Sequence, residues 1–365
     1  MKKILYISAT SEYGGGPQHL FDLTKNLKDK YNYIIAIPKT GMFWKKFKDQ
    51  KCELFQIPHR RFSLFLAIKL AILVKKNSID IIHTHGKGGD VYGRFISFFT
   101  GVPLVYTPHG LHFSQYSFVM KILYFSYEKF TGGIIKKIIF VSDTEKNKAK
   151  ELNFWKKELF NVIYNGIVSQ KLNIRSPEAK NLLRLKEKEK YKSIIINLSR
   201  FNYQKNVNEI IEIAKEMPES LFCIIGHGEE FEKVKLFLNK VNLKNIYLHG
   251  FTENTHDLIN ISDIYLSTSR WEGMPLSIIE AMQLEKPIVA SDVIGNKDLV
   301  CHGEVGFNYK LGNISEAVMY LNKILNNKEL SLKMGKSGKR IQQMKYSIKQ
   351  MVEETQKIYK ELLIN

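Results

Sequence analysis

The chain has 365 residues, of which 44% are hydrophobic and 25% are charged. This balance is typical of globular proteins and excludes a mainly disordered chain, a collagen-like repeat and a coiled coil. The length predicts two domains, or at most three. Three widely spaced cysteines, Cys52, Cys223 and Cys301, exclude a disulfide scaffold and a cysteine-rich zinc site, and they favour a reducing compartment.

The charge is strongly positive, with 55 Lys and Arg against 36 Asp and Glu, a formal net charge of +19. Such a charge attracts polyanions, namely nucleic acids, anionic lipid headgroups or phosphorylated metabolites. A composition biased towards Lys, Asn and Ile is the alternative explanation. The apolar stretch at the N-terminus is too short for a signal peptide. The longest apolar run, residues 62–74, contains Lys69 and is shorter than the ~20 residues that a membrane span needs. We therefore expect a cytoplasmic protein that can dock at the inner face of the cell membrane.

Short runs rich in Ile, Val, Leu, Phe and Tyr predict buried parallel strands. In the first half they lie at residues 3–8, 33–37, 54–57, 79–84, 104–107, 138–141 and 160–163. In the second half they lie at residues 193–198, 221–225, 246–249, 264–267 and 288–290. Helical patterns such as residues 17–28 and 63–76 separate them, which predicts an α/β fold of two doubly wound, Rossmann-like domains. We expect an N-terminal domain at 1–168, a polar linker with a short helix at 169–192, and a C-terminal domain at 193–345.

The first predicted strand leads into a glycine loop, Gly14 to Gly16, followed by Pro17 and a helix. Exposed amides at a helix N-terminus attract phosphate. The loop is neither G-x-G-x-x-G nor a Walker motif, so a simple tight turn between strand and helix is the alternative.

Four histidines, His83, His85, His109 and His112, lie at or near the ends of the fourth and fifth predicted strands. They predict either a metal site or a polar face for a ligand. No Asp or Glu lies at metal-site spacing, and H-E-x-x-H and D-x-D motifs are missing, so we favour the ligand face and expect no metal. His109, followed by Gly110, is the candidate to face the ligand.

In the second half, Arg200 and Lys205 lie between a strand end and a helix that starts near Val207. Arginine binds phosphate bidentately and lysine acts as a point charge, so the pair suits a diphosphate. Charges on a solvated loop are the alternative. Later strands also end in short turns, Gly226-His-Gly and Gly250-Phe-Thr.

The most specific segment is residues 270–282, Arg-Trp-Glu-Gly-Met-Pro-Leu-Ser-Ile-Ile-Glu-Ala-Met. We expect Glu272 in a turn, a helix opening at Gly273, and Glu280 about one and a half turns into that helix. Amides at the helix start can hold an anion while a carboxylate accepts hydrogen bonds from a diol. This combination predicts a site for a phosphorylated sugar, and an acidic pair on the surface is the alternative.

Taken together, these motifs resemble the retaining glycosyltransferases of the GT-B fold, in glycosyltransferase family 4, over nearly the whole chain. The Glu-(seven residues)-Glu segment carries the resemblance most specifically. The supporting motifs are Gly14 to Gly16, Pro108-His-Gly, Tyr164-Asn-Gly, Arg200 with Lys205, Gly226-His-Gly and Gly250-Phe. The resemblance implies two domains facing across a cleft, with residues 346–365 forming a helix that crosses back to the first domain.

The resemblance also implies a role for each matching residue. Arg200 and Lys205 would grip the diphosphate, Glu280 would hold the ribose hydroxyls, and His109 would touch the sugar. Catalysis would then rest on Glu272, His109, Arg200 and Lys205. The remaining donor-binding residues would be Gly15, Gly16, Gly226, Phe251, Thr252, Gly273, Met274, Pro275 and Leu276. Two departures from the family pattern are Tyr203-Gln-Lys-Asn after the arginine and Tyr164 in place of a proline.

The implied activity is sugar transfer from a nucleotide-diphosphate sugar, UDP-sugar before others, with retention at the anomeric carbon and without a metal or other cofactor. Residues 62–76 and 113–137 interleave apolar side chains with lysines, which suits either a helix at an anionic membrane surface or core packing. We expect a lipid-linked or glycan acceptor and a place in the synthesis of a bacterial surface polysaccharide such as a capsule. The alternatives are a nucleotide-sugar 2-epimerase of the same fold and, suggested by charge alone, a nucleic-acid binder. No nucleic-acid-binding motif is present, so we expect no such partner.

Overall fold

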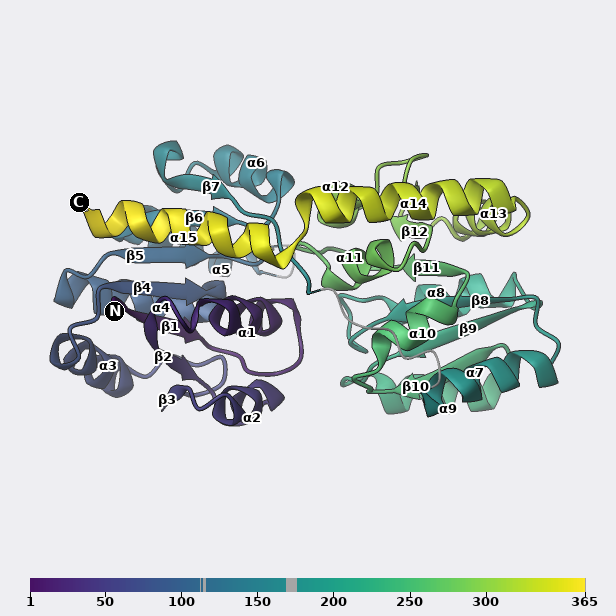
Figure 1. Cartoon of the computed structure of the whole chain (residues 1–365), viewed down its shortest axis with the longest axis horizontal. Helices are drawn as coiled ribbons and strands as arrows, with labels where there is room; N and C mark the ends of the chain where they lie inside the picture. The colour runs from purple at the N-terminus through teal and green to yellow at the C-terminus, as the bar shows by residue number, and fades with distance from the viewer. Residues whose placement is uncertain (112, 114–115, 169–175, 365) are drawn as a thin grey trace. The chain divides into compact units, whose positions relative to one another are not determined.

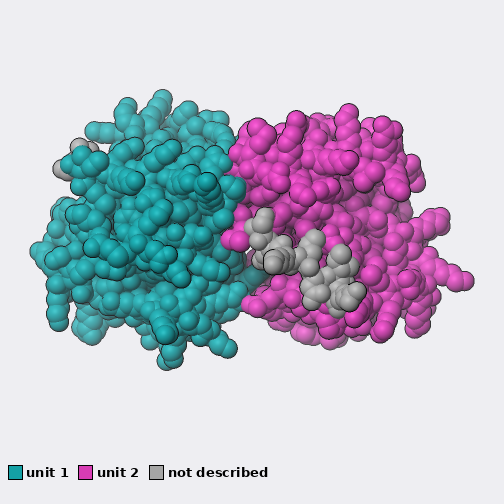
Figure 2. Space-filling model, in the orientation of Figure 1, with its two compact units in different colours: residues 1–166, 347–365 teal, residues 167–346 magenta. Residues whose placement is uncertain are grey.

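The computed structural model describes residues 1–111, 113, 116–168 and 176–364, which form two compact units. Unit 1 comprises Met1–Gly166 together with Ser347–Asn365, and unit 2 comprises Ile167–Tyr346 (Figure 2). Of the segment 169–192, expected as a linker, residues 169–175 lie outside the described residues. The rest belongs to unit 2, where Pro177–Lys188 forms a helix that begins after a side-chain cap at Ser176.

Unit 1 is built on a parallel sheet with the order β3-β2-β1-β4-β5-β6-β7 in its described residues (Figure 1). Its strands are β1 (Lys3–Ser8), β2 (Asn32–Ile37), β3 (Glu53–Gln56), β4 (Ile81–His85), β5 (Leu104–Thr107), β6 (Ile135–Phe140) and β7 (Phe160–Val162). Its α-helices are α1 (Gly15–Leu27), α2 (Met42–Asp49), α3 (Leu64–Lys76), α4 (Gly86–Thr100), α5 (Phe118–Thr131), α6 (Asp143–Leu152) and α15 (Ile348–Ile364). One core packs α3, α4 and α5 on a face of the sheet, and a second core packs α1, α2 and α15 on the other.

Two strands of unit 1, β4 and β6, start two or three residues away from the starts that the apolar runs predict. Ile79 is buried, but its N–H donates to Val74 O (3.0 Å) at the end of α3, so β4 begins only at Ile81. In β6 the strand includes Lys136 and Lys137, which interrupt the apolar run and hide its first residues from a search by hydrophobicity.

A buried ionic network joins α4 to α5. The Arg94 guanidinium contacts Asp90 (2.6 Å) on its own helix and Glu128 (2.5 Å) on α5, and Trp155 Nε1 donates to the same Glu128 carboxylate (3.1 Å). Burial raises the pKa of Asp90 to about 7 against the opposing effect of Arg94. Because removing one member would leave a buried charge unpaired, this network fixes how α4 and α5 pack.

Helix α15 lies on the sheet of unit 1 beside α1, although about 180 residues separate it from the rest of the unit (Figure 1). Met351, Val352 and Tyr359 are buried in the core that also holds Tyr6 of β1. The Tyr359 hydroxyl is hydrogen-bonded to His83 Nδ1 (2.5 Å) and Tyr6 Oη (3.2 Å). The C-terminal segment is therefore an integral part of unit 1.

Unit 2 is built on a second parallel sheet, with the order β10-β9-β8-β11-β12-β13 in its described residues. Its strands are β8 (Ser193–Leu198), β9 (Ser220–Ile225), β10 (Ile246–Gly250), β11 (Ile264–Ser267), β12 (Ile288–Ser291) and β13 (Gly306–Tyr309). Its α-helices are α7 (Pro177–Lys188), α8 (Val207–Lys215), α9 (Phe231–Val241), α10 (Thr255–Ile261), α11 (Leu276–Gln283), α12 (Asn296–Leu299), α13 (Ile314–Leu325) and α14 (Lys328–Lys345).

Strand β13 has no counterpart in the sequence prediction. It is short, and it contains Gly306 and Asn308, which strands usually avoid. Gly306 pairs with Ile288 of β12, and a Cβ at this position would lie 1.8 Å from Ile288 O. The close approach of β12 therefore requires glycine at position 306. The local sequence pattern does not reveal this requirement.

The prediction of two doubly wound, Rossmann-like domains is confirmed. Both sheets continue in opposite directions from a central pair of strands, β1 and β4 in unit 1 and β8 and β11 in unit 2. In open α/β sheets, ligands bind beyond the carboxyl ends of strands at this switch point. Among the described residues, no helix combines the length and apolar content that crossing a bilayer requires.

Replacing Tyr359 by Phe tests how α15 is held. We expect Tyr359→Phe to lower the free energy of opening of unit 1 by about 1–3 kcal/mol, because His83 Nδ1 and the Tyr6 hydroxyl lose a buried partner. Native-state hydrogen exchange of amides in β1 and β4 measures this free energy. On the same helix, Glu361→Gln removes an exposed ion pair with Lys137 (2.7 Å) and should cost less than about 1 kcal/mol. Equal effects of the two variants would contradict this account.

Candidate functional site

In unit 2, two glycines allow the segments that follow β8 and β9 to pack closely against each other. A Cβ on Gly226 would lie 1.9 Å from Ser199 O, and a Cβ on Gly228 would lie 2.5 Å from Phe201 O. The N–H of Phe201 donates to His227 O (3.2 Å) in return. Gly226, which the sequence predicts to bind the donor, therefore has a packing role. Its close contact with Ser199 fixes the loop after β8, which carries Arg200 and Lys205.

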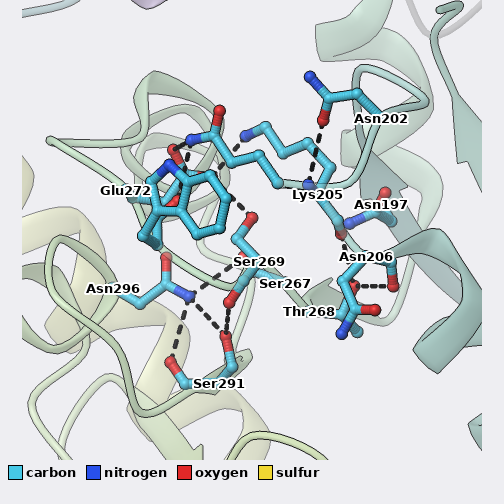
Figure 3. A network of polar contacts seen from close by, with 12 residues as sticks. Asn197, Asn202, Lys205, Asn206, Ser267, Thr268, Ser269, Glu272, Ser291 and Asn296 are labelled. Atoms are coloured by element: carbon cyan, nitrogen blue, oxygen red, sulfur yellow. Dashed lines mark hydrogen bonds and ion pairs between the residues drawn. The ribbon is translucent and has the colours of Figure 1, made fainter. Parts of the chain in front are cut away.

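Lys205, at the end of that loop, contacts Glu272 in the turn after β11 (Figure 3). Its Nζ lies 2.6 Å from Glu272 Oε1, and the two side chains are 20% and 8% exposed, respectively. These residues are far apart in sequence and come from the two central strands of the sheet. The structure thus brings together two of the four predicted catalytic residues at the switch point of unit 2.

The Glu272 carboxylate has further donors around it. Ser269 Oγ donates to Oε1 (2.6 Å), and Gln204 Nε2 donates to Trp271 O (2.9 Å) and lies 3.5 Å from Oε2. Behind the turn, a Cβ on Gly295 would lie 2.6 Å from Glu272 Cβ. Sequence reasoning missed Ser269, Gln204 and Gly295, although the first two directly flank the predicted motifs and could have been found there.

Hydrogen bonds connect the loop after β8 to the loop after β11. Thr268 Oγ1 donates to Lys205 O (3.0 Å), and Arg270 Nη2 donates to Asn206 Oδ1 (2.7 Å). Arg270 also lies over the Tyr203 ring, 4.4 Å from its centroid. Lys205 is therefore placed by backbone contacts as well as by its own ion pair (Figure 3).

The helix after Glu272 begins later than the sequence predicts. Helix α11 starts at Leu276, with Pro275 as its N-cap residue, so Gly273 and Met274 belong to the preceding turn. Proline has no N–H, so Pro275 offers no donor to an anion. Glu280 is the fifth residue of α11, about one turn in rather than one and a half.

Glu280 and Glu272 both act on the pKa of a buried tyrosine. Burial raises the pKa of Tyr265, and the negative charges of Glu280 and Glu272 raise it further against a hydrogen bond with Ser277. Glu280 lies on α11, the helix that follows the turn holding Glu272.

The other predicted residues of unit 2 come after the ends of β8 and β10. Arg200 is partly exposed, two residues after the end of β8. Phe251 is an exposed ring after β10. Thr252 is buried, and its hydroxyl accepts from Asn254 N (3.0 Å), so it acts within the fold.

In unit 1, the glycine loop lies against a histidine. Helix α1 starts at Gly15, where a Cβ would meet no atom within 4 Å, and a Cβ on Gly16 would lie 3.4 Å from the ring of His109. His109 has φ 57° and Gly110 has φ 119°, both in the left-handed region that L side chains rarely adopt. Gly15, Gly16 and His109 therefore lie together, as three predicted site residues.

A carboxylate that the sequence analysis missed holds His109 in this conformation. Buried Glu145 accepts from Gly110 N through Oε1 (2.6 Å) and from Val141 N through Oε2 (3.1 Å). Hydrogen bonds to an ionised acceptor are about twice as strong as neutral ones, which suits a strained turn. A glutamate in the first turn of the helix after the neighbouring strand was the available signal, because helix N-termini favour acidic residues.

His109 belongs to a cluster of imidazoles. His85 Nδ1 is hydrogen-bonded to His109 Nε2 (3.0 Å), and His19 Nδ1 is hydrogen-bonded to Asn165 Oδ1 (2.8 Å). Ligand atoms of His19, His85 and His109 lie within 4.8 Å of one another, so among the described residues this group could hold a metal ion. The hydrogen bonds already give each ring a polar partner. His112, the fourth histidine of the sequence motif, lies outside the described residues.

The cluster is uncharged at neutral pH. Burial lowers the pKa of His19 to about 4, against the raising effect of its bond to Asn165. Burial also lowers the pKa of His83, His85 and His109 well below 6.5, and neighbouring histidines add to this. Neutral rings can accept hydrogen bonds, which suits contact with sugar hydroxyls.

These shifts predict that unit 1 loses stability in acid. The unfolded chain takes up protons near pH 6.5 while the folded rings stay neutral, so stability is present above pH 6.5 and is lost as pH falls towards 4. Each histidine contributes a slope of up to about 1.4 kcal/mol per pH unit. Native-state hydrogen exchange between pH 7 and pH 5 should show a shallower slope for His19→Gln than for the wild type. Exposed His302 gives the control, His302→Gln, and equal slopes in all three proteins would contradict the assignment.

Two family models match the chain over adjacent halves. Residues 13–171 match Glycosyltransferase Family 4, and residues 180–341 match Glycosyl transferases group 1. The putative glycosyltransferase EpsD of Bacillus subtilis (strain 168) is 25% identical over 98% of this chain and 96% of its own length. An Escherichia coli enzyme, UDP-Gal:alpha-D-GlcNAc-diphosphoundecaprenol alpha-1,3-galactosyltransferase, is 28% identical over 87% of this chain and 86% of its own length.

Solved structures agree at the level of the fold. Anabaena HepE, in its crystal structure with UDP-glucose, superimposes with a TM-score of 0.83 at 20% identity, over 99% of this chain and 100% of HepE. WaaG, a glycosyltransferase involved in lipopolysaccharide biosynthesis, has a TM-score of 0.73 at 14% identity, over 98% of this chain and 99% of WaaG. The chain is therefore a glycosyltransferase of the GT-B type, with a Glycosyltransferase Family 4 part at residues 13–171 and a Glycosyl transferases group 1 part at residues 180–341.

Proposed function

We propose that this glycosyltransferase moves a sugar from a UDP-sugar to a lipid-linked glycan, in the synthesis of a bacterial surface polysaccharide. The observation that carries the proposal is the contact between Lys205 and Glu272 at the carboxyl ends of β8 and β11. A cation and an acceptor side by side suit the two parts of such a donor, its diphosphate and its sugar. The names of the Escherichia coli galactosyltransferase and of the HepE complex with UDP-glucose support a uridine donor.

Lys205 and Arg200 would meet the diphosphate. The Lys205 ammonium is balanced by Glu272 at 2.6 Å, and this ion pair fixes its position. When a diphosphate binds Lys205 in place of Glu272, the Glu272 carboxylate can accept hydrogen bonds from the sugar hydroxyls. Glu280, one turn into α11, would accept from the ribose hydroxyls.

The reaction would be driven mainly by stabilising the leaving group. The bond from the anomeric carbon to the diphosphate oxygen breaks, and negative charge grows on that oxygen beside fixed cations. The acceptor hydroxyl attacks the anomeric carbon from the same face, and its proton passes to the departing diphosphate, so the anomeric configuration is retained. Because Arg200 and Lys205 supply the positive charge, this proposal requires no metal. In unit 1, neutral His109, held by Glu145, would contact the sugar.

Four substitutions test the donor site. We expect Arg200→Ala and Lys205→Ala each to lower turnover about 100- to 1000-fold, the usual cost of one lost preorganised group. Glu280→Ala should weaken UDP binding measured by calorimetry, whereas Glu272→Ala should mainly lower the rate of transfer. Lys215→Ala is the matched control, since Lys215 forms an exposed pair with Glu212 on α8 (2.7 Å).

Two results would contradict this assignment. One is unchanged turnover in Arg200→Ala or Lys205→Ala while the control behaves like the wild type. The other is release of an epimer when the enzyme is incubated with the donor alone, which would indicate a 2-epimerase.

We further propose that unit 1 docks on an anionic membrane. Helices α3, α4 and α5 share one face of the sheet, and their inner residues, such as Ala67 and Leu70, are buried in its core. The same helices thus carry a buried inner side and an exposed apolar outer side. We call the outer side the apolar face, defined by exposed Phe65, Ile68, Ile72, Phe98, Phe99, Phe118, Val119, Met120, Ile122, Leu123 and Phe130.

Lysines border the apolar face, including Lys69, Lys75 and Lys76 on α3. An apolar surface with basic neighbours is the arrangement by which amphipathic helices bind anionic lipids. Such a surface would also bring the enzyme to a lipid-linked acceptor.

Flotation with phosphatidylglycerol vesicles at low salt tests this docking. We expect the wild type to float and the double variant Phe65→Glu, Ile72→Glu to stay behind, because each change places a carboxylate where an acyl chain would lie. Leu236→Glu in unit 2 is the control, since Leu236 is as exposed as Phe65 (68% and 65%) but lies on α9. A wild type that does not float, or a double variant that floats equally well, would contradict the proposal.

A further inference from the structure

An aromatic site that the donor chemistry does not use lies beside α5 in unit 1. Lys87, in the first turn of α4, points its ammonium at three rings. Its Nζ lies 4.2 Å from the ring centroid of Phe113, 4.8 Å from that of Tyr124 and 4.9 Å from that of Tyr116. It also lies 3.5 Å from the Tyr116 hydroxyl. The lysine follows β4 directly, so the site lies at the carboxyl edge of the sheet, where α/β proteins bind ligands.

A second cation approaches the same ring. Lys148 of α6 has its Nζ 5.9 Å from the centroid of Phe113. Burial lowers the pKa of Lys87 to about 8, Glu128 opposes this shift, and the charge of Lys148 lowers it further. Two ammonium groups held on one apolar ring repel each other, and an anion that binds both removes that repulsion.

The surface next to this site is apolar. Helix α5 begins two residues after Tyr116, and Phe118, Val119, Met120, Ile122 and Leu123 of its first turns are all exposed. Tyr124, one of the rings beside Lys87, lies on the same helix and contacts Tyr116 at 5.8 Å between ring centroids. A ligand bound at the lysines therefore has an exposed hydrocarbon surface within reach of its next atoms.

We propose that Lys87 and Lys148 bind the phosphate groups of the lipid acceptor, and that the first turns of α5 hold the adjoining part of its hydrocarbon chain. The inference rests on the proposed lipid-linked acceptor and adds the residues that recognise it. Charge complementarity and the neighbouring apolar surface select this occupant, because a diphosphate on a long chain carries both features. A nucleotide or a free glycan has no hydrocarbon chain to place on the exposed side chains of α5.

Binding of farnesyl diphosphate, a short amphiphilic diphosphate, tests the site without relying on transfer. The measurement is calorimetry on the full chain with UDP at a saturating concentration, so that a second diphosphate site in unit 2 is filled. We expect farnesyl diphosphate to bind more tightly than inorganic diphosphate and more tightly than farnesol. Lys87→Met and Lys148→Met should each weaken this binding about 10- to 100-fold, the usual range for a lost charge-assisted hydrogen bond.

Matched variants separate recognition from packing. Lys46→Met removes a lysine that lies over Phe43 (5.3 Å) on α2 of the same unit, and it should bind farnesyl diphosphate like the wild type. Lys87→Arg keeps the charge and should recover most of the affinity. Lys148→Met keeps the test decisive if Lys87→Met is unstable.

The affinity should also fall as pH rises above about 8, because Lys87 loses its proton there in the free protein and keeps it in the complex. The groups around Lys87 include the Tyr116 hydroxyl, the Tyr124 ring, and the charges of Glu128 and Lys148.

The outcomes are distinct from those that test the donor site. Wild-type affinity in both methionine variants, or affinity that follows the phosphatidylglycerol content of added vesicles rather than farnesyl diphosphate, would overturn the acceptor site. UDP binding should be the same in Lys87→Met and the wild type. A protein that binds farnesyl diphosphate through Lys87 but shows no binding of UDP would support this inference while contradicting the proposed donor.

Discussion

The ion pair of Lys205 and Glu272 is the interaction on which the proposed donor site depends. Both side chains are largely buried at the ends of two central strands, and each is surrounded by groups that fix its position. An ion pair that loses water must be held in good geometry to be tolerated, and here Ser269 and Gln204 complete the shell around the carboxylate. The pair is thus a preorganised charge arrangement, which is what the proposed departure of a diphosphate requires.

Close backbone approaches make this arrangement possible. Gly226 and Gly228 allow the loop after β9 to lie on the loop after β8, and Gly295 allows the segment after β12 to lie against Glu272. In unit 1, Gly16 does the same for the ring of His109, whose left-handed backbone is held by Glu145. In both units the glycines serve the packing of loops at the sheet edge, and the polar side chains are placed as a result.

Most strands could be located from the sequence, because parallel strands buried on both faces are continuous apolar runs, as in residues 193–198. It failed where tertiary contacts decide, as in β13, where Gly306 is dictated by the neighbouring strand. Among site residues, Glu272 and Lys205 were predictable because their motifs carry them. Glu145, His19 and Ser269 were missed, since they act through partners distant in sequence or through a turn whose shape the motif does not reveal, although Ser269 flanks a predicted motif and Glu145 lies in a first helical turn. The start of α11 at Leu276 was also missed, because Gly-Met-Pro can extend a turn as readily as it can open a helix.

A crystal structure of the protein with UDP tests the central claim most directly. The account predicts that the diphosphate lies at the ends of β8 and β11, with Lys205 Nζ within hydrogen-bond distance of a phosphate oxygen and more than 2.6 Å from Glu272 Oε1. Arg200 should contact the same diphosphate, and Glu280 should accept from the ribose. A diphosphate bound elsewhere, with the pair between Lys205 and Glu272 unchanged, would contradict it.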